Sequence, residues 1–518
     1  MLLHLDTPAD GAGTVGNVVH VQGWAHDEDS PVGAVTILFD GVPLTRAGLT
    51  WPRPDVAEGF DDPRMRLCGF DRVLTLPRSL RTPGAHTVAV EARLLDGRHA
   101  RTSPVTVELP VLPVLPEEPA APLGPRADRP GEQIHSVWLA RSLDRGGSQL
   151  RMAETLEHLA GCGWTATVLA PTDGPLRARL ERAGVEVRLV DPVPFDDAAG
   201  YQRSVRALVD QLADADLAVA PTVTSFPLVH AARLAGVPAV QRIGEAAPLP
   251  TVVAWLSGRL DLEVEEHARR AIGGAVSIWT NAQSVADAYR EDGYGDRFAV
   301  IYTGAPRPDP AAQPSRAEAR AGLGLAADRR VLVFAGTVWP VKGQGLLVEA
   351  VRAVRRDHPE LLVALVGYDQ NAYAGHLREH LGAHDLTDTV TIVPFEDDLG
   401  SWWAAADAVA LTAHNPSESL SSALVEGMAH GLPALASRTG DSAVMVEDGV
   451  SGWLCEPDDL ESLVGALRRF AESEPPTLRA YGEQAALRCA REDDRASALA
   501  KVTEMLEASA RSSAMSPA

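Results

Sequence analysis

The stretch Asn415–Glu426, NPSESLSSALVE, places two glutamates eight positions apart and decides the fold of the region around it. It follows an apolar run, Ala408–Thr412, whose pattern predicts a buried strand. Ser421 and Ser422 are good N-cap residues, so we expect a helix to begin there. The first turn of such a helix offers free backbone N–H groups and a positive dipole end, which together attract a phosphate.

The two glutamates flank this predicted phosphate site. Glu426 would lie within the helix, where its carboxylate can accept hydrogen bonds from a diol such as a ribose. Glu418 would lie in the loop before the helix, where it can meet a sugar hydroxyl. A nucleotide-sugar presents phosphate, ribose and sugar, so the segment predicts contacts to all three. The spacing alone also fits a solvated carboxylate pair on one helix face, and that alternative stays open.

The residues that follow give this segment its context. GMAHGLPALAS runs over Gly427–Ser437 and VEDGVSGWL over Val446–Leu454, with Asp458 and Asp459 behind them. In this order, the helix, the Gly-x-Pro turn and the Asp-Gly-x-x-Gly loop resemble the C-terminal domain of retaining, nucleotide-sugar-dependent glycosyltransferases of family four. The resemblance covers about residues 133–505. It implies the GT-B fold, in which two doubly wound Rossmann-like domains enclose the active site.

Composition narrows the possible partners and location. The 518 residues are too many for one core, so several domains are expected. A net charge of −23 argues against nucleic acid, and against an anionic membrane as a purely electrostatic partner. Four scattered cysteines indicate a reduced cytoplasmic setting. We see no signal peptide and no apolar window of about 18 residues, so no transmembrane segment is expected. The expected location is the cytoplasm, or its membrane surface for a peripheral protein.

Residues 1–109 read as an all-β domain. Short runs of alternating apolar and polar residues are separated by turn signals, which predicts a small β-sandwich. The stretches Gly23–Ala25, Arg53–Val56 and Gly69-Phe70 resemble an immunoglobulin-like module appended to bacterial glycosyltransferases. Trp24 and Trp51 either bind glycan or pack within the fold, and packing is the favoured interpretation.

A proline-rich linker is predicted over residues 110–131. Proline recurs at every third position from Pro110 to Pro125, the period of a polyproline II helix. The sixteen residues from Pro110 to Pro125, at about 3.1 Å each, would span about 50 Å when extended. We therefore expect the sandwich to move independently of the rest.

Beyond the linker the pattern changes to strands alternating with helices. This alternation predicts parallel, doubly wound sheets. An N-terminal, acceptor-side Rossmann-like domain is expected over residues 132–304, and a C-terminal domain that binds the nucleotide-sugar over residues 305–518.

The first such domain carries a Gly-Gly loop, Asp144–Gln149, between its first strand and the next helix. A glycine pair at the carboxyl edge of a parallel sheet lets a ligand approach the backbone closely. The family has a similar loop that faces donor sugar and acceptor. The resemblance therefore implies an acceptor-side set that includes a catalytic position at Gly147: Gly146, Gly147, Ser148 and Glu245.

The second domain carries the loop Gly336–Gln344, GTVWPVKGQ, after its first strand. It resembles the family loop whose basic residues hold the donor pyrophosphate. Lys342 matches the family lysine and can neutralise charge on the departing diphosphate. A solvated surface lysine is the alternative. Thr337 and Val341 stand where the family often has arginine, so one positive charge is missing.

The resemblance also implies a donor site, and two positions of this chain differ from the family pattern. The donor-binding residues expected are Gly336, Thr337, Lys342, Phe395, Ser419, Leu420, Ser421, Ser422 and Glu426, with Glu418 and Lys342 as catalytic residues beside Gly147. Phe395 would lie near the nucleotide base. Gly244 stands where many relatives have a histidine that contacts the donor sugar, and Val444 where many have a glutamate.

The sequence thus predicts a retaining glycosyltransferase of carbohydrate biosynthesis. It would move a sugar from a nucleoside-diphosphate sugar to a hydroxyl of a glycan, lipid-linked or small-molecule acceptor, with no metal ion and no cofactor. A GT-B epimerase or hydrolase, and a non-catalytic glycan- or nucleotide-binding protein, are the alternatives. The base, the sugar, the acceptor and the oligomeric state stay open.

Overall fold

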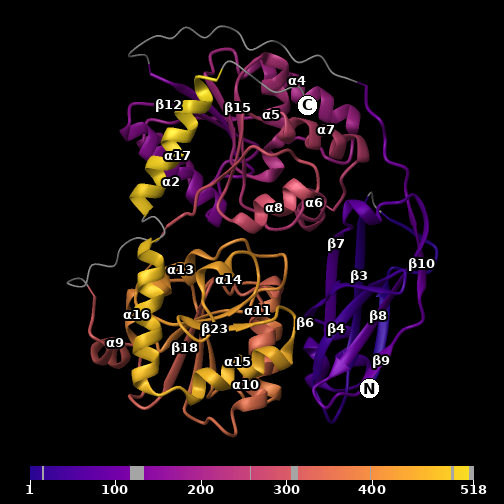
Figure 1. The fold of residues 1–518 in the computed structure, drawn as a ribbon, viewed down its shortest axis with the longest axis vertical. Coiled ribbons are helices and arrows are strands. Elements are labelled where there is room, and N and C mark those ends of the chain that lie inside the picture. The colour runs from indigo at the N-terminus through magenta and orange to yellow at the C-terminus, as the bar shows by residue number, and fades with distance from the viewer. Residues whose placement is uncertain are drawn as a thin grey trace.

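A computed structural model describes residues 1–14, 17–116, 133–256, 258–304, 313–396, 398–491 and 495–512 of the chain. Two antiparallel sheets at the N-terminus precede two α/β units, each built on one parallel sheet (Figure 1). The predicted fold class, a GT-B pair of Rossmann-like units behind an all-β region, is confirmed. Most of the predicted spacer, from residue 117 on, lies outside the described residues.

The N-terminal region is a sandwich of two sheets. The strands are β1 (Leu2–Thr7), β2 (Ala12–Gly13), β3 (Val18–His26), β4 (Val32–Phe39), β5 (Val42–Arg46), β6 (Gly48–Trp51), β7 (Gly69–Thr75), β8 (Gly84–Leu94), β9 (His99–Arg101) and β10 (Val105–Leu109). One sheet has the order β1-β3-β7-β6, and the other β2-β10-β8-β4-β5 with β9 beside β8. Side chains alternate between core and surface along β3, so Val19 and Val21 fill the space between the sheets.

The first α/β unit has seven parallel strands in the order β13-β12-β11-β14-β15-β16-β17. They are β11 (His135–Leu139), β12 (Thr165–Ala170), β13 (Glu186–Leu189), β14 (Leu217–Ala220), β15 (Ala239–Ile243), β16 (Ser277–Thr280) and β17 (Phe298–Val300). The order reverses between β11 and β14. Loops that leave neighbouring strands in opposite directions open a crevice at such a point, and the predicted Gly-Gly loop follows β11 there.

The second α/β unit repeats this plan with six parallel strands in the order β20-β19-β18-β21-β22-β23. They are β18 (Arg330–Ala335), β19 (Leu361–Val366), β20 (Val390–Val393), β21 (Ala408–Leu411), β22 (Ala434–Ser437) and β23 (Gly452–Cys455). Its reversal falls between β18 and β21. The loops carrying Lys342 and Glu418 leave these two strands, so the topology brings them together.

Helices cover both faces of each parallel sheet. In the first unit they are α2 (Gly147–Gly161), α3 (Arg177–Arg182), α4 (Ala198–Asp210), α5 (Phe226–Ala235), α6 (Leu249–Leu256), α7 (Leu262–Gly273) and α8 (Gln283–Glu291). In the second they are α9 (Arg316–Gly322), α10 (Gln344–Val354), α11 (Ala372–Ala383), α12 (Gly400–Ala405), α13 (Ser422–Ala429), α14 (Ser442–Met445), α15 (Leu460–Glu472) and α16 (Pro475–Arg491). The last helix, α17 (Arg495–Ala510), returns to the first unit (Figure 1). No helix in the described part of the chain is both long and apolar enough to cross a membrane.

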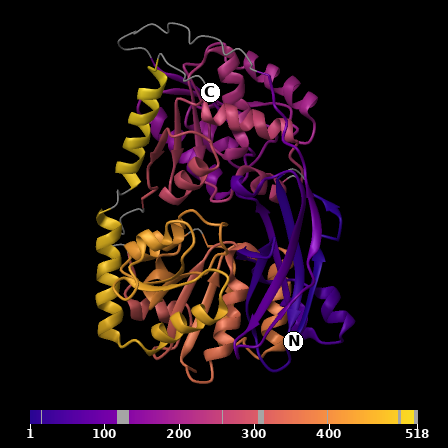
Figure 2. The ribbon, with the colours of Figure 1, turned by 45° about the vertical axis from the view of Figure 1, so that its right-hand side comes forward.

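The sandwich lies beside the second α/β unit and reaches the first unit at one end (Figure 2). On the first unit, Arg81 donates to Asp292 at 2.5 Å, and the hydroxyls of Thr75 and Thr251 are 2.8 Å apart. The guanidinium of Arg270 on α7 also donates to the carbonyls at the start of the linker, at Leu115 and Pro116.

On the second unit, the sandwich uses its β6 edge and a short 3₁₀ helix, η1 (Pro63–Leu67). Arg66 of η1 pairs with Glu379 of α11 at 2.7 Å, and Arg46 pairs with Asp459 at 3.0 Å. Trp51 is half-buried, and its indole nitrogen is buried. The expectation that the sandwich moves independently is wrong, because polar contacts fix it to both units.

We expect Arg81→Ala to destabilise the protein by about 3 kcal/mol, because it leaves the largely buried carboxylates of Asp292 and Glu265 without this cation. Chemical denaturation would measure the loss, with Arg101→Ala on the exposed edge of β9 as the control. Equal stability of the two variants would show that this bridge contributes nothing.

Candidate nucleotide-sugar site

Two loops meet at the switch point of the second unit and are fastened to each other. The Thr412 hydroxyl donates to the Gly343 carbonyl at 2.9 Å, and the Ser417 hydroxyl to the Val341 carbonyl at 2.8 Å. Gly343 has φ of +77°, and a Cβ there would lie 1.9 Å from the Thr412 carbonyl oxygen. Only glycine fits such a position, so the loop conformation is built into the sequence.

Lys342 and Glu418, the two side chains expected to be catalytic, are brought together by these loops. The Lys342 Nζ lies 2.5 Å from Glu418 Oε2, with the side chains 30% and 16% exposed. The interpretation of Lys342 as a solvated surface residue therefore does not hold. The chain has only one other lysine, Lys501, in a very arginine-rich sequence. Lysine carries a compact ammonium on a flexible stem, whereas arginine presents a planar fork of N–H donors. Position 342 carries the ammonium.

The helix predicted after this loop begins where expected. The Ser421 hydroxyl accepts from the Leu424 amide at 3.3 Å and caps α13, whose first residue is Ser422. Ser419 and Leu420, expected to bind donor, are buried. The Ser419 hydroxyl donates to the Gly244 carbonyl at 2.8 Å, and Leu420 packs in the core of the second unit. Their side chains are thus occupied, and only their backbone is left to meet a ligand.

Glu426 is held by a tryptophan. Its Oε1 accepts from the indole N–H of Trp403 on α12 at 3.1 Å, which fixes the carboxylate within the helix. Trp402 and Trp403 are both buried, and each donates to a carboxylate, since Trp402 donates to Glu396 at 3.0 Å. A buried indole N–H usually has a hydrogen-bond partner, but the sequence does not show which carboxylate it contacts.

The other expected donor residues surround the same edge of the sheet. Gly336 has φ of +151°, and the Thr337 carbonyl accepts from Gln344 at 2.9 Å. Phe395 follows β20 and is 63% exposed, so its ring is free to meet a planar base. Val444, which replaces a frequent glutamate, is 44% exposed.

The Gly-Gly loop of the first unit has open space in front of it. Gly146 is the N-cap of α2 and Gly147 its first residue. A Cβ on Gly147 would meet no atom within 4 Å. The Ser148 hydroxyl donates to Gln149 at 2.8 Å. Glu245 instead serves the fold, because its Oε2 accepts from the amides of Gly244 and Val223 at 3.0 and 3.2 Å.

A buried arginine explains the glycine at position 244. Arg242 in β15 is 7% exposed, donates to the Pro221 carbonyl at 3.1 Å and lies 5.3 Å from the ring centroid of Trp279. A Cβ on Gly244 would lie 2.8 Å from Arg242 Nη1. The guanidinium therefore occupies the space that a side chain at 244 would need. Sequence reasoning missed Arg242, although a charged residue inside the buried run AVQRI was a signal.

Arg242 belongs to a group of arginines within the first unit. With Arg151 of α2 and Arg495 of α17 it lines a small cavity of about 30 Å³. Burial, and then the charge of Arg495, lowers the pKa of the Arg151 guanidinium, whereas the charges of Glu154 and Glu426 oppose that shift. Arg151 thus lies within electrostatic reach of Glu426 in the second unit.

Asp441 ties the units together. Its carboxylate accepts from the amides of Gln283 and Ser284 at the start of α8, at 2.6 and 2.9 Å, and from the Tyr302 hydroxyl at 2.8 Å. A carboxylate at a helix N-terminus is favoured by the helix dipole. Nothing in the local sequence separates Asp441 from other loop aspartates, so only the fold reveals this contact.

Comparisons with known proteins agree with this architecture. The family model described as Glycosyl transferase 4-like domain matches residues 146–304, and the one described as Glycosyl transferases group 1 matches residues 315–488. A D-inositol 3-phosphate glycosyltransferase of Saccharomonospora viridis is 39% identical over 169 residues, which are 30% of this chain and 38% of that protein. One from Streptomyces avermitilis is 28% identical over 69% of this chain and 83% of its own length.

Solved structures share the fold. Anabaena Alr3699/HepE in complex with UDP and glucose has a TM-score of 0.60 and 22% identity, over 72% of this chain and 100% of that one. Sucrose-phosphate synthase from Thermosynechococcus elongatus has a TM-score of 0.58 and 18% identity, over 73% and 99%. With both family models matched in order along two parallel α/β units, the chain belongs to the group 1 glycosyltransferases of family four, which have the GT-B fold.

Proposed function

We propose that this protein transfers a hexose from a nucleoside-diphosphate sugar to an acceptor hydroxyl, with retention of anomeric configuration and without a metal ion. The observation that carries the proposal is the Lys342–Glu418 pair at the switch point, next to the start of α13. A cation and a helix N-terminus suit a diphosphate, and a carboxylate suits sugar hydroxyls. Glu426, held by Trp403, would bind the ribose.

The chemistry assigned to each group follows from its charge. Donor binding would draw Lys342 from Glu418 to the diphosphate, which frees the Glu418 carboxylate for the sugar. As the bond between the anomeric carbon and the phosphate oxygen breaks, Lys342 and the first turn of α13 stabilise the developing charge. The acceptor oxygen bonds to the same face of that carbon and gives its proton to the departing phosphate. The open space before Gly147 would admit the reacting sugar.

Arg151 and Arg242 of the first unit could replace the positive charge missing at Thr337 and Val341. Arg151 lies within electrostatic reach of Glu426, and Arg242 fills the place beside Gly244. Positive potential in a cleft between low-dielectric walls attracts a diphosphate more strongly than the same charge in open solvent. We assign these two arginines to the electrostatics of the cleft rather than to direct transfer.

The acceptor and the location extend this proposal. The relatives above are named for D-inositol 3-phosphate, so this acceptor is the first to test, beside glycan and lipid-linked acceptors. All four cysteines are free thiols, which suits a reducing compartment such as the cytoplasm.

Glu426→Gln should weaken UDP binding about tenfold or more, because an ionised acceptor of ribose hydrogen bonds is lost. Isothermal titration calorimetry would measure the dissociation constant, with Glu483→Gln on the exposed face of α16 as the matched control. Wild-type affinity in the Glu426 variant would remove this residue from the donor site.

The two lysines allow a direct footprint of the phosphate site. We expect UDP-glucose or UDP to protect Lys342 from acetylation while Lys501 reacts as before, as read by mass spectrometry. Lys342→Ala should lower kcat by about 10²- to 10³-fold through lost stabilisation of the leaving group, with Lys501→Ala as control. Equal labelling of Lys342 with and without nucleotide would contradict the assignment.

Metal independence predicts that added Mg²⁺ or Mn²⁺ leaves kcat unchanged when transfer from UDP-, GDP- and ADP-sugars is followed by product mass. Transfer that needs either ion would overturn this part of the proposal. Sugar release or conversion without any acceptor would instead favour an epimerase or hydrolase. Tight nucleotide binding with no turnover would favour a binding protein.

A further inference from the structure

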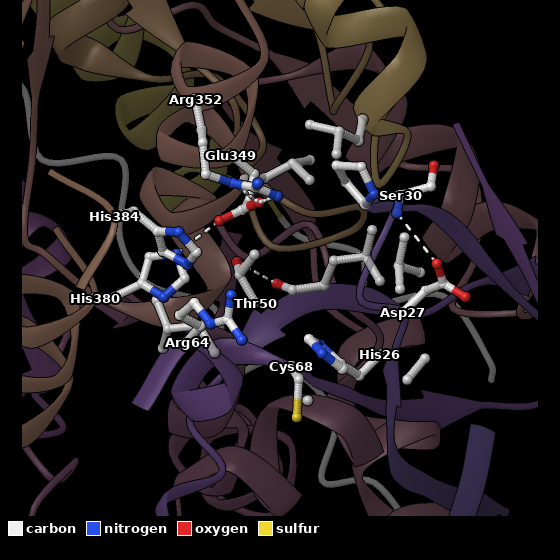
Figure 3. Close-up of a pocket in the computed structure, with 18 of the residues that line it drawn as sticks. His26, Asp27, Ser30, Thr50, Arg64, Cys68, Glu349, Arg352, His380 and His384 are labelled. Carbon is white, nitrogen blue, oxygen red and sulfur yellow. Dashed lines mark hydrogen bonds and ion pairs between the residues drawn. The ribbon is translucent and has the colours of Figure 1, made fainter. Parts of the chain in front are cut away.

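A cavity of about 200 Å³ lies between the sandwich and the second unit, away from the residues assigned to transfer (Figure 3). One wall comes from the sandwich and includes His26, Asp27 and Cys68. The other comes from α10 and α11. Most of its polar lining has no part in the proposed reaction, so its chemistry needs a separate account.

Three side chains with metal-binding chemistry meet on the α10–α11 wall (Figure 3). Glu349 lies on α10, and His380 and His384 lie one turn apart on α11 and directly after it. Residues four apart lie on one face of a helix, so both imidazoles approach the same carboxylate. One ligand atom from each of the three residues lies within 4.8 Å of the other two.

We propose that Glu349, His380 and His384 bind a divalent transition-metal ion, of which Zn²⁺ fits this donor set best. Two imidazole nitrogens and a carboxylate oxygen are donors that zinc prefers, and three protein ligands leave a fourth position for water. That position would face the cavity. Cys68 of the sandwich lines the same cavity but is not one of the three grouped residues, so thiolate is not part of the set.

The surroundings of Glu349 suit a metal ligand. Arg352 donates twice to its Oε2, at 2.6 and 2.9 Å, and fixes the carboxylate while Oε1 points to His380. Ligating carboxylates are commonly oriented by such outer hydrogen bonds.

The histidines give a second, independent reason. His380 has a side chain only 4% exposed; its Nε2 is 2.6 Å from Glu349 Oε1, while its Nδ1 has no hydrogen-bond partner among the described residues. A buried polar nitrogen without a partner calls for an additional ligand.

The ion would link two helices at the base of the sandwich. Glu349 lies six residues after Gly343, about 9 Å along the helix axis from the donor loop, so the metal would not contact the diphosphate. The expected role is to brace α10 and α11 where the sandwich packs on them, with β6 on α10 and η1 on α11.

Co²⁺ is the probe for the test, because four-coordinate Co²⁺ absorbs in the visible. Full-length protein freed of metal with EDTA should bind one equivalent of Co²⁺ with these bands, and Zn²⁺ should displace it. Zinc at 100 times its dissociation constant should stabilise the fold by about 2.7 kcal/mol, seen as a raised Tm. A protein without visible bands and without a Tm shift would overturn the proposal.

Variants locate the site. His384→Ala and Glu349→Gln should each lose the Co²⁺ bands and the zinc-dependent rise in Tm, whereas His99→Ala on the exposed edge of β9 should keep both. His384→Ala, at the end of its helix, serves if Glu349→Gln does not fold. Bands that persist in folded His384→Ala would place the metal elsewhere. UDP binding should survive in His384→Ala, so this result is separate from that of the transferase proposal.

Discussion

The close approach of two loops at the switch point between β18 and β21 is the constraint on which the rest of the site depends. Gly343 has no side chain, so the loop after β18 can touch the Thr412 carbonyl. That contact places Lys342 beside Glu418, in the loop that leads into the start of α13. A parallel sheet cannot bring these groups together anywhere else, because only at the reversal of strand order do neighbouring loops diverge and leave a crevice.

Buried polar groups join the two units. Asp441 receives the start of α8, Ser419 contacts Gly244, and Arg242 fills the space beside that glycine. Hydrogen bonds depend on direction, so these contacts fix how the two units lie against each other. A cleft that must admit a donor and release a diphosphate needs an interface of this kind.

The sandwich adds a third body that touches both units at once. Arg81 reaches the first unit, and Arg46 and Arg66 reach the second. Any hinge motion between the units must therefore move against these ion pairs or carry the sandwich with one of them. The cavity between the sandwich and the second unit is lined by Glu349, His380 and His384. It lies beside α10 and α11, on which the sandwich would press during such a motion.

The fold class, the order of strands and helices, the glycine loops and the place of Glu418 and Glu426 around one helix start could be predicted from the amino-acid sequence. These depend on local periodicity, on caps and on glycine positions, which are written in consecutive residues. Other features appear only in the folded chain. The sandwich is fixed to both units, and Trp403 holds Glu426. Arg242 fills the space that a side chain at position 244 would need, and Glu349 meets two histidines some thirty positions away. Those contacts join residues far apart in the chain, and no local pattern encodes a distance in space.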